Sequence, residues 1–132
     1  MTTDMGFRLS KQRKVILEEL KKVKTHPTAD EVYDMVRKII PRISLGTVYR
    51  NLEFLCGKGL ILKLGAPGAQ KRFDGTPEPH PHIRCAVCTS VADVDCDIEI
   101  PVIPSECTSG YTILSTNVEF VGVCPDCQEA RQ

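Results

Sequence analysis

The first half of the chain has apolar residues at helical spacing, and this pattern predicts three short helices. They cover residues 10–23, 29–40 and 44–59. The positions predicted to face inward are Val15, Ile16, Leu20, Val23, Val32, Met35, Val36, Ile39, Ile40, Val48, Leu52 and Leu55. Thr28 and Glu31 have the spacing of a capping box, in which each side chain bonds a backbone amide at the start of the second helix.

A β-hairpin is predicted directly after the third helix. Residues 60–64 and 71–74 alternate around the turn at 65–70. Three short helices followed by a hairpin form a winged helix-turn-helix, in which the third helix enters the DNA major groove. Residues 1–74 are therefore predicted to be a winged-helix DNA-binding domain.

The candidate DNA contacts lie at the start of the third helix and on the hairpin. They are Ser44, Thr47, Tyr49, Arg50, Asn51, Lys63, Lys71 and Arg72. Tyr49 and Arg50 are the candidates for the groove, because exposed side chains of that helix read base edges. A helical bundle with a solvated basic face is the structural alternative.

The pattern changes in the second half of the chain. Residues 75–81 are rich in proline and predict a linker, and residues 82–132 predict a dimerisation and metal-binding domain. Residues 111–123 alternate like one long or bent strand, and residues 82–95 read as a hairpin. A small antiparallel sheet with little core favours dimerisation. The expected fold class is α+β.

Charge divides the chain in the same place. Residues 1–73 hold 15 Lys and Arg against 7 Asp and Glu, whereas residues 74–132 hold 2 against 10. A basic half joined to an acidic half is typical of a protein of which one part meets nucleic acid, although a random division of surface charge remains the alternative. No stretch has the roughly 18 apolar residues of a membrane span, so the sequence predicts a cytoplasmic protein without a membrane partner.

Four of the seven cysteines form two Cys-x-x-Cys pairs, Cys85 with Cys88 and Cys124 with Cys127. In a cytosolic chain such pairs indicate metal or redox chemistry rather than a disulfide framework. Four thiolates complete a closed tetrahedral site typical of structural zinc (Zn2+). A rubredoxin-like iron centre has the same ligands, while a redox dithiol needs only one pair. The remaining cysteines are expected to be buried or inert thiols: Cys56, Cys96 and Cys107.

A second set of candidate ligands offers only nitrogen and oxygen atoms: His26, Asp74, His80, His82 and Asp93. Such donors suit Fe2+, Mn2+ or Zn2+. His80 and His82 are two residues apart, a spacing that puts both imidazoles on one face of a strand. Each residue also has an ordinary structural interpretation, such as a turn at Asp74.

The whole chain resembles the ferric uptake regulator family of bacterial metal-dependent repressors. The resemblance rests on HPTADEVYD (26–34), ISLGTVYRNLEFL (43–55), HPHIRCAVC (80–88), Asp93 and CPDC (124–127). It implies a homodimer that binds a palindromic operator when a regulatory metal site is loaded. It also implies structural zinc at the four paired cysteines and no enzymatic activity.

Within the family, the chain looks most like the peroxide-sensing branch, because Asp93 stands where iron-sensing members more usually have glutamate. This resemblance implies a regulatory Fe2+ or Mn2+ at the five histidines and aspartates. It also implies that peroxide, reacting with bound iron, oxidises His26 or His80 and releases the operator. No histidine follows His82, so a third metal site is not expected.

Three other functions remain open from the sequence alone. The first is an iron- or zinc-responsive repressor of the same family that ignores peroxide. The others belong to different classes, a thiol redox protein and a zinc-ribbon interaction module. A redox enzyme would not need the basic winged helix, and a plain module would not need nitrogen and oxygen ligands in both halves of the chain.

Overall fold

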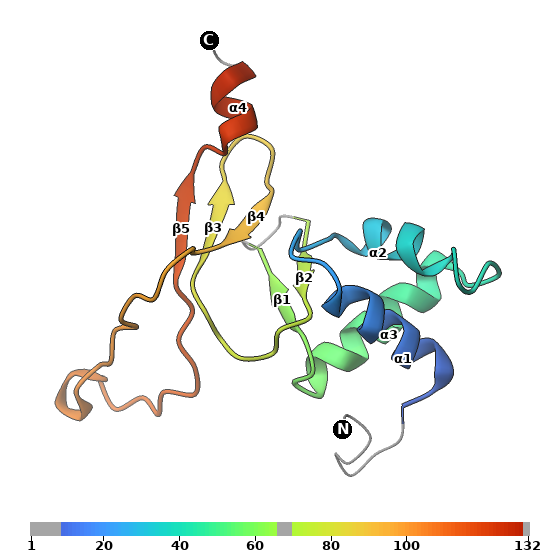
Figure 1. The fold of residues 1–132 in the computed structure, drawn as a ribbon. Helices are drawn as coiled ribbons and strands as arrows, with labels where there is room; N and C mark the ends of the chain where they lie inside the picture. The colour runs from blue at the N-terminus through green and yellow to red at the C-terminus, as the bar shows by residue number, and fades with distance from the viewer. Residues whose placement is uncertain (1–8, 66–69, 131–132) are drawn as a thin grey trace. The chain divides into compact units, whose positions relative to one another are not determined.

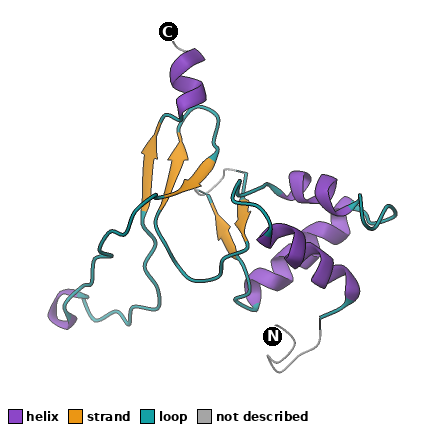
Figure 2. Ribbon diagram, in the orientation of Figure 1, coloured by secondary structure: helices purple, strands orange, loops and turns teal. Residues whose placement is uncertain are grey.

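The computed structural model describes residues 9–65 and 70–130. The chain divides into two compact units, Met1–Glu78 and Pro79–Gln132. Helices dominate the first unit and a small sheet the second (Figures 1 and 2), which confirms the α+β class. None of the helices in the described ranges is long and apolar enough to cross a membrane.

The first unit contains the three predicted helices. They are α1 (Lys11–Lys21), α2 (Ala29–Val36) and α3 (Leu45–Gly57). A hydroxyl from Ser10, Thr28 or Ser44 accepts a hydrogen bond from a first-turn amide of each, and the predicted capping box at α2 is confirmed. α2 is shorter than predicted: it ends at Val36, and the amides of Ile39 and Ile40 both donate to the Val36 carbonyl in the turn that follows.

The core of this unit forms where each helix packs against the other two. Its most buried side chains are Ile16, Leu20, Val32, Val36, Val48, Leu52, Leu55 and Ile61. All but Ile61 come from the predicted helical stripes. Burial of these aliphatic side chains is the main favourable contribution to the stability of the unit.

A two-stranded antiparallel hairpin completes the first unit. β1 (Leu62–Leu64) pairs with β2 (Arg72–Asp74), with Lys63 opposite Phe73. The Phe73 side chain is buried in the helical core, and its amide donates to the Pro27 carbonyl at 2.9 Å. β2 is thereby attached to the segment that precedes α2. Residues 66–69 of the predicted turn lie outside the described part of the chain.

The second unit is built on a three-stranded sheet in the order β4-β3-β5. The strands are β3 (His82–Cys85), β4 (Val91–Asp93) and β5 (Glu119–Gly122), and two short helices, η1 (Ser105–Cys107) and α4 (Pro125–Ala130), complete the unit. β3 runs antiparallel to β4 but parallel to β5.

Two sequence predictions for this unit are wrong. The sheet is mixed rather than antiparallel, because the long connection from β4 brings the chain to the opposite edge of β3, the kind of crossover that parallel pairing requires. The long strand predicted at 111–123 shrinks to β5, because only residues 119–122 pair with β3. Alternation alone does not make a strand where no neighbouring strand supplies hydrogen bonds.

The packing of the first unit predicts the effect of shortening one core side chain. Leu52→Ala leaves a cavity where α3 meets its neighbours and should lower the free energy of unfolding by about 2–5 kcal/mol. Leu45→Ala, on the exposed start of the same helix, is the matched control and should cost less than about 1 kcal/mol. Urea denaturation followed by circular dichroism measures both. Equal losses would contradict this account of the core.

Candidate metal centres

The parallel pairing of β3 and β5 brings the two Cys-x-x-Cys motifs together. Cys85 ends β3 opposite Gly122, which ends β5, and the Ala86 amide donates to the Gly122 carbonyl at 2.8 Å. Strands that run in the same direction end at the same edge of the sheet. Each chain segment then enters its own cysteine pair, so Cys88 lies in the turn after β3 and Cys124 lies two residues after the end of β5.

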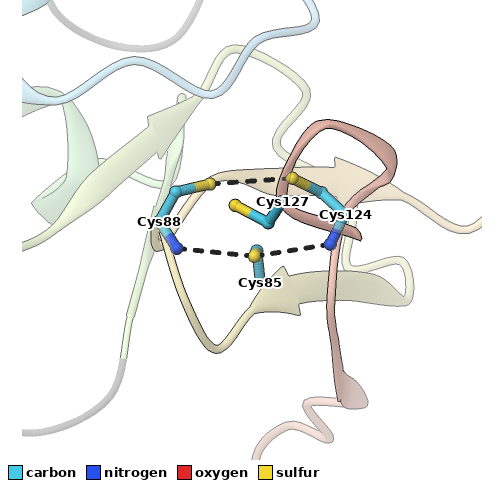
Figure 3. A group of neighbouring side chains, drawn as sticks. All are labelled: Cys85, Cys88, Cys124 and Cys127. Atoms are coloured by element: carbon cyan, nitrogen blue, oxygen red, sulfur yellow. Dashed lines mark hydrogen bonds between the residues drawn. The ribbon is translucent and has the colours of Figure 1, made fainter. Parts of the chain in front are cut away.

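The four sulfurs form a cluster that fits a tetrahedral metal site. They lie within 4.8 Å of one another, and the Cys88 and Cys124 sulfurs are 3.8 Å apart (Figure 3). Four sulfurs at about 2.3 Å from a central zinc ion would be separated by about 3.8 Å. Distance and donor type therefore both fit Zn2+, held by Cys85, Cys88, Cys124 and Cys127.

Hydrogen bonds shift the pKa values of three thiols in this cluster. The backbone amides of Cys88 and Cys124 donate to the Cys85 sulfur, each at 3.4 Å, and they lower the pKa of its thiol to about 6. The Ser90 hydroxyl lowers the pKa of Cys88. Sharing a proton with the Cys124 sulfur raises the pKa of Cys127 to about 12. Since adjacent thiolates repel one another, a bound cation would remove the obstacle to ionising all four.

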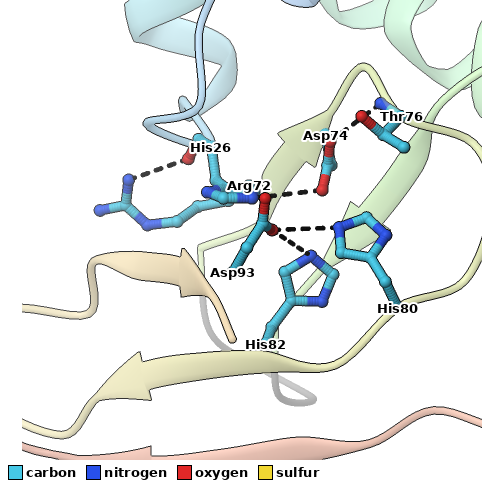
Figure 4. A network of polar contacts seen from close by, with 7 residues as sticks. All are labelled: His26, Arg72, Asp74, Thr76, His80, His82 and Asp93. Atoms are coloured by element: carbon cyan, nitrogen blue, oxygen red, sulfur yellow. Dashed lines mark hydrogen bonds and ion pairs between the residues drawn. The ribbon is translucent and has the colours of Figure 1, made fainter. Parts of the chain in front are cut away.

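The second unit also gathers three nitrogen and oxygen donors. The register of β3 on β4 places His82 directly opposite Asp93. One Asp93 oxygen, Oδ1, lies 3.0 Å from His80 Nε2 and 3.3 Å from His82 Nε2 (Figure 4). The two imidazole rings are 4.3 Å apart between centroids. The predicted clustering of His80 and His82 on one face, with Asp93 beside them, therefore occurs within this unit.

The first unit contains a buried pair, His26 and Asp74. His26 Nε2 lies 3.2 Å from Asp74 Oδ2 (Figure 4), and both side chains are almost fully buried. The other Asp74 oxygen accepts a hydrogen bond from the Thr76 amide at 2.9 Å. The sequence allowed a surface position for His26 and a simple turn at Asp74, and the structure instead pairs the two side chains and buries both.

Arg72 fixes the backbone of this pair. Its Nη1 donates to the His26 carbonyl at 3.1 Å and lies 3.5 Å from the Glu31 carboxylate of the capping box. His26 has a φ of 53°, a left-handed conformation that costs free energy for a residue with a side chain. The bond from Arg72 stabilises that conformation. Arg72, predicted as a DNA contact, is thus directed into the unit, a role that no local sequence pattern indicates.

The exposed start of α3 holds a short chain of hydroxyls and a guanidinium. Ser44 Oγ donates to Thr47 Oγ1 at 2.8 Å, and Arg50 Nη2 donates to the same Thr47 oxygen at 3.1 Å. Tyr49, on the same turn of the helix, is 43% exposed. Three of the predicted DNA contacts, Ser44, Thr47 and Arg50, are therefore joined on one surface, and Arg50 is already oriented on it.

The structure corrects the prediction for Asn51. Its side chain is buried, and its Oδ1 accepts a hydrogen bond from Arg13 Nε on α1 at 3.1 Å. Helical spacing contained the signal, because Asn51 follows Val48 by three residues and precedes Leu55 by four, and both face the core. Asn51 therefore lies at the buried edge of the side of α3 that carries Thr47 and Arg50.

The lysines of the hairpin have partners inside the first unit. Lys63 Nζ lies 3.0 and 3.1 Å from the two carboxylate oxygens of Glu53 on α3. Lys71 Nζ donates to the Gly65 carbonyl at 3.3 Å. Lys63 carries a compensated charge, so its contribution to an anion-binding surface is smaller than its sequence position suggests.

Three helices with a hairpin, followed by a sheet with a four-cysteine cluster, define the class of two-unit, metal-binding transcription regulators. Residues 4–121 match the profile of the ferric uptake regulator family, and the chain belongs to that family. It is therefore a metal-dependent transcriptional repressor and not an enzyme.

Known proteins of this family resemble the chain over most of its length. The peroxide-responsive repressor PerR of Staphylococcus aureus is 33% identical over 126 residues, covering 94% of this chain and 84% of the relative. The Campylobacter jejuni peroxide stress regulator superposes with a TM-score of 0.68 at 28% identity, over 88% of each chain. The Helicobacter pylori ferric uptake regulator shares the fold, with a TM-score of 0.70 at 23% identity over 96% of this chain and 86% of that one.

The cysteine cluster predicts which thiols retain metal. Cys124→Ser removes one of four convergent sulfurs and should abolish stoichiometric zinc in protein purified under reducing conditions. Cys107→Ser, at an exposed cysteine of the same unit, is the control and should leave the zinc content unchanged. Atomic emission spectroscopy gives the metal-to-protein ratio. Full zinc in Cys124→Ser, or iron in place of zinc in the unaltered protein, would contradict the assignment.

Proposed function

We propose that this chain is a cytoplasmic homodimeric repressor that senses hydrogen peroxide and releases a palindromic operator when a ligand histidine is oxidised. The observation that carries the proposal is the pair of ligand sets that contain no thiolate. Unit one contributes His26 and Asp74, and unit two contributes His80, His82 and Asp93. Nitrogen and oxygen donors of this kind suit Fe2+ or Mn2+.

In this proposal, one regulatory ion takes ligands from both units. Such an ion favours the arrangement of the units in which both sets reach it, and so it favours one spacing between the two DNA-binding units of a dimer. The difference in metal affinity between arrangements equals the free energy available to strengthen operator binding. Loss of the ion reverses the effect.

The start of α3 is the surface proposed to meet the major groove. Tyr49 and Arg50 are exposed there, and Ser44 and Thr47 add hydroxyls suited to phosphate oxygens. Lys71, on the hairpin, is the proposed backbone contact of the wing. A palindromic operator follows from a two-fold dimer, because each protomer presents the same helix to one half-site.

Exposed apolar side chains in the second unit support homodimerisation. The most exposed are Val102 at 87%, Tyr111 at 75% and Leu114 at 93%. Phe120 and Ile83, partners across β5 and β3, add to the apolar surface on one face of the sheet. Exposed apolar side chains of this kind are unfavourable in water and are typical of an interaction site.

Peroxide sensing is the finer part of the proposal, and similarity to peroxide regulators supports it. The five histidines and aspartates would hold Fe2+, which would lend an electron to open the oxygen–oxygen bond of hydrogen peroxide and regain it from the imidazole, so that the iron is not consumed. One peroxide oxygen is added to the imidazole of His26 or His80, and the other leaves as water. The histidine loses two electrons and the peroxide gains two, so the reaction balances. The oxidised ring is a poorer ligand, which accounts for release of the operator.

The shared ion predicts that a change in either unit abolishes metal-dependent operator binding. His26→Asn, chosen because asparagine tolerates a left-handed backbone, should weaken manganese binding by at least about 10-fold. Asp93→Asn in the other unit should do the same. Both variants should keep their zinc, since no cysteine is changed.

The matched controls are Thr25→Asn and Asp95→Asn, which change exposed neighbours of the two ligands. Calorimetric titration of manganese, with gel-shift assays on a palindromic duplex selected from a random pool, measures the effects. If only one of the two ligand variants lost manganese, the single ion shared by both units would be excluded.

Peroxide should release the operator from protein loaded with iron but not from protein loaded with manganese. Anaerobic protein with Fe2+, treated with hydrogen peroxide, should gain one oxygen atom in the peptide that holds His26 or His80, as detected by mass spectrometry. Protein with Mn2+ is the control. Equal release of both forms, or none, would sink the peroxide mechanism and favour a repressor that responds to iron or zinc alone.

A further inference from the structure

Arg13 on α1 is held by two residues of α3. Its Nε donates to the buried Asn51 Oδ1 at 3.1 Å, and its guanidinium carbon lies 3.6 Å from the centroid of the Phe54 ring. The amide fixes one edge of the guanidinium and the ring supports its face. Nε uses one of five N–H donors, so the two terminal nitrogens keep their four. Arg13 is half-buried, and these two contacts set the orientation of its guanidinium group before any ligand binds.

The partners of Arg13 differ from those of several other cations in this unit. Carboxylates neutralise four of them, in the pairs Lys22–Glu19, Arg37–Asp34, Lys63–Glu53 and Arg72–Glu31. Within residues 9–65 and 70–130, Arg13 makes no ion pair. The two groups that contact Arg13, the Asn51 amide and the Phe54 ring, are neutral. Arg13 therefore keeps its full charge for an anion from outside.

Helical spacing places Arg13 beside the proposed recognition surface. Thr47, Arg50, Asn51 and Phe54 stand at i, i+3, i+4 and i+7 on α3 and so share one side of that helix. Arg50 is one turn from Phe54, over which Arg13 lies. Both arginines are oriented by neutral groups, Arg50 by the Thr47 hydroxyl. One side of α3 thus presents two uncompensated guanidinium groups, one of them supplied by α1.

We propose that Arg13 binds a phosphate of the operator backbone and that the buried Asn51, with Phe54, holds it in position to do so. A phosphate is the expected anion because a cation on the flank of a groove-binding helix meets the groove wall, which is formed by the backbone. Guanidinium also suits phosphate in geometry and charge. This contact rests on the proposed DNA-binding function and adds α1 to the interface.

The salt dependence of operator binding tests the contact. Each phosphate contact contributes about 0.9 to the slope of log affinity against log salt concentration. Arg13→Met keeps an apolar stem over Phe54 but removes the charge, so a dimer should lose about 1.8 from the slope. Its affinity should fall by at least about 10-fold, equally for the selected palindrome and for a mixed-sequence duplex. Asn51→Ala should lose affinity with a smaller change of slope, since the charge remains but is no longer held.

The control is Lys21→Met, which removes an exposed cation at the other end of α1. Thermal unfolding of each variant separates loss of contact from loss of fold. Lower affinity with an unchanged slope would mean that Arg13 only supports α3, and altered discrimination between the two duplexes would mean a base contact. Either result overturns the proposal, as does unchanged affinity. If the unaltered protein bound no duplex, the proposed DNA-binding function would fail as well. The two failures are distinguishable, because Arg50→Ala reduces operator binding only in a protein that binds the operator at all.

Discussion

β3 is hydrogen-bonded along both edges, and the two candidate metal sets of the second unit depend on those pairings. At its start, antiparallel pairing with β4 sets His82 opposite Asp93. At its end, parallel pairing with β5 sets Cys85 beside the second cysteine pair. His82 and Cys85 are three residues apart, so they point to opposite faces of the sheet about 10 Å from each other. A slip of one residue would turn both ligands to the wrong face.

β2 has a comparable role in the first unit, because each of its three residues makes a different contact. Phe73 enters the core on one face, while Arg72 and Asp74 lie on the other, where both act on His26. The left-handed backbone of His26 is unfavourable by itself, and bonds to its carbonyl and to that of Pro27 offset the cost. The local strain is therefore stabilised by the strand that also carries Asp74, which couples the hairpin to the histidine.

Local signals predicted the first unit well and the second only in part. Helices, caps and buried stripes follow from neighbouring residues, and the cysteine and histidine sets follow from short motifs and a family resemblance. The parallel pairing of β3 with β5 was missed because it joins segments far apart in sequence, and no local pattern encodes direction. The inward position of Asn51 could have been predicted from its spacing to Val48, but its polarity suggested an exposed role.

Net charge alone does not show which cations of residues 1–73 are paired with acidic side chains. An excess of Lys and Arg in residues 1–73 indicates attraction to a polyanion, yet several of those cations are compensated within the unit, as Lys63 is by Glu53. An exposed ion pair adds little stability. Its acidic member nevertheless cancels positive charge that an approaching anion would otherwise meet. Other cations are oriented by neutral groups, Arg50 by a hydroxyl and Arg13 by an amide. Orientation by a neutral partner fixes direction without cancelling charge, and this distinguishes a built anion-binding surface from a basic composition.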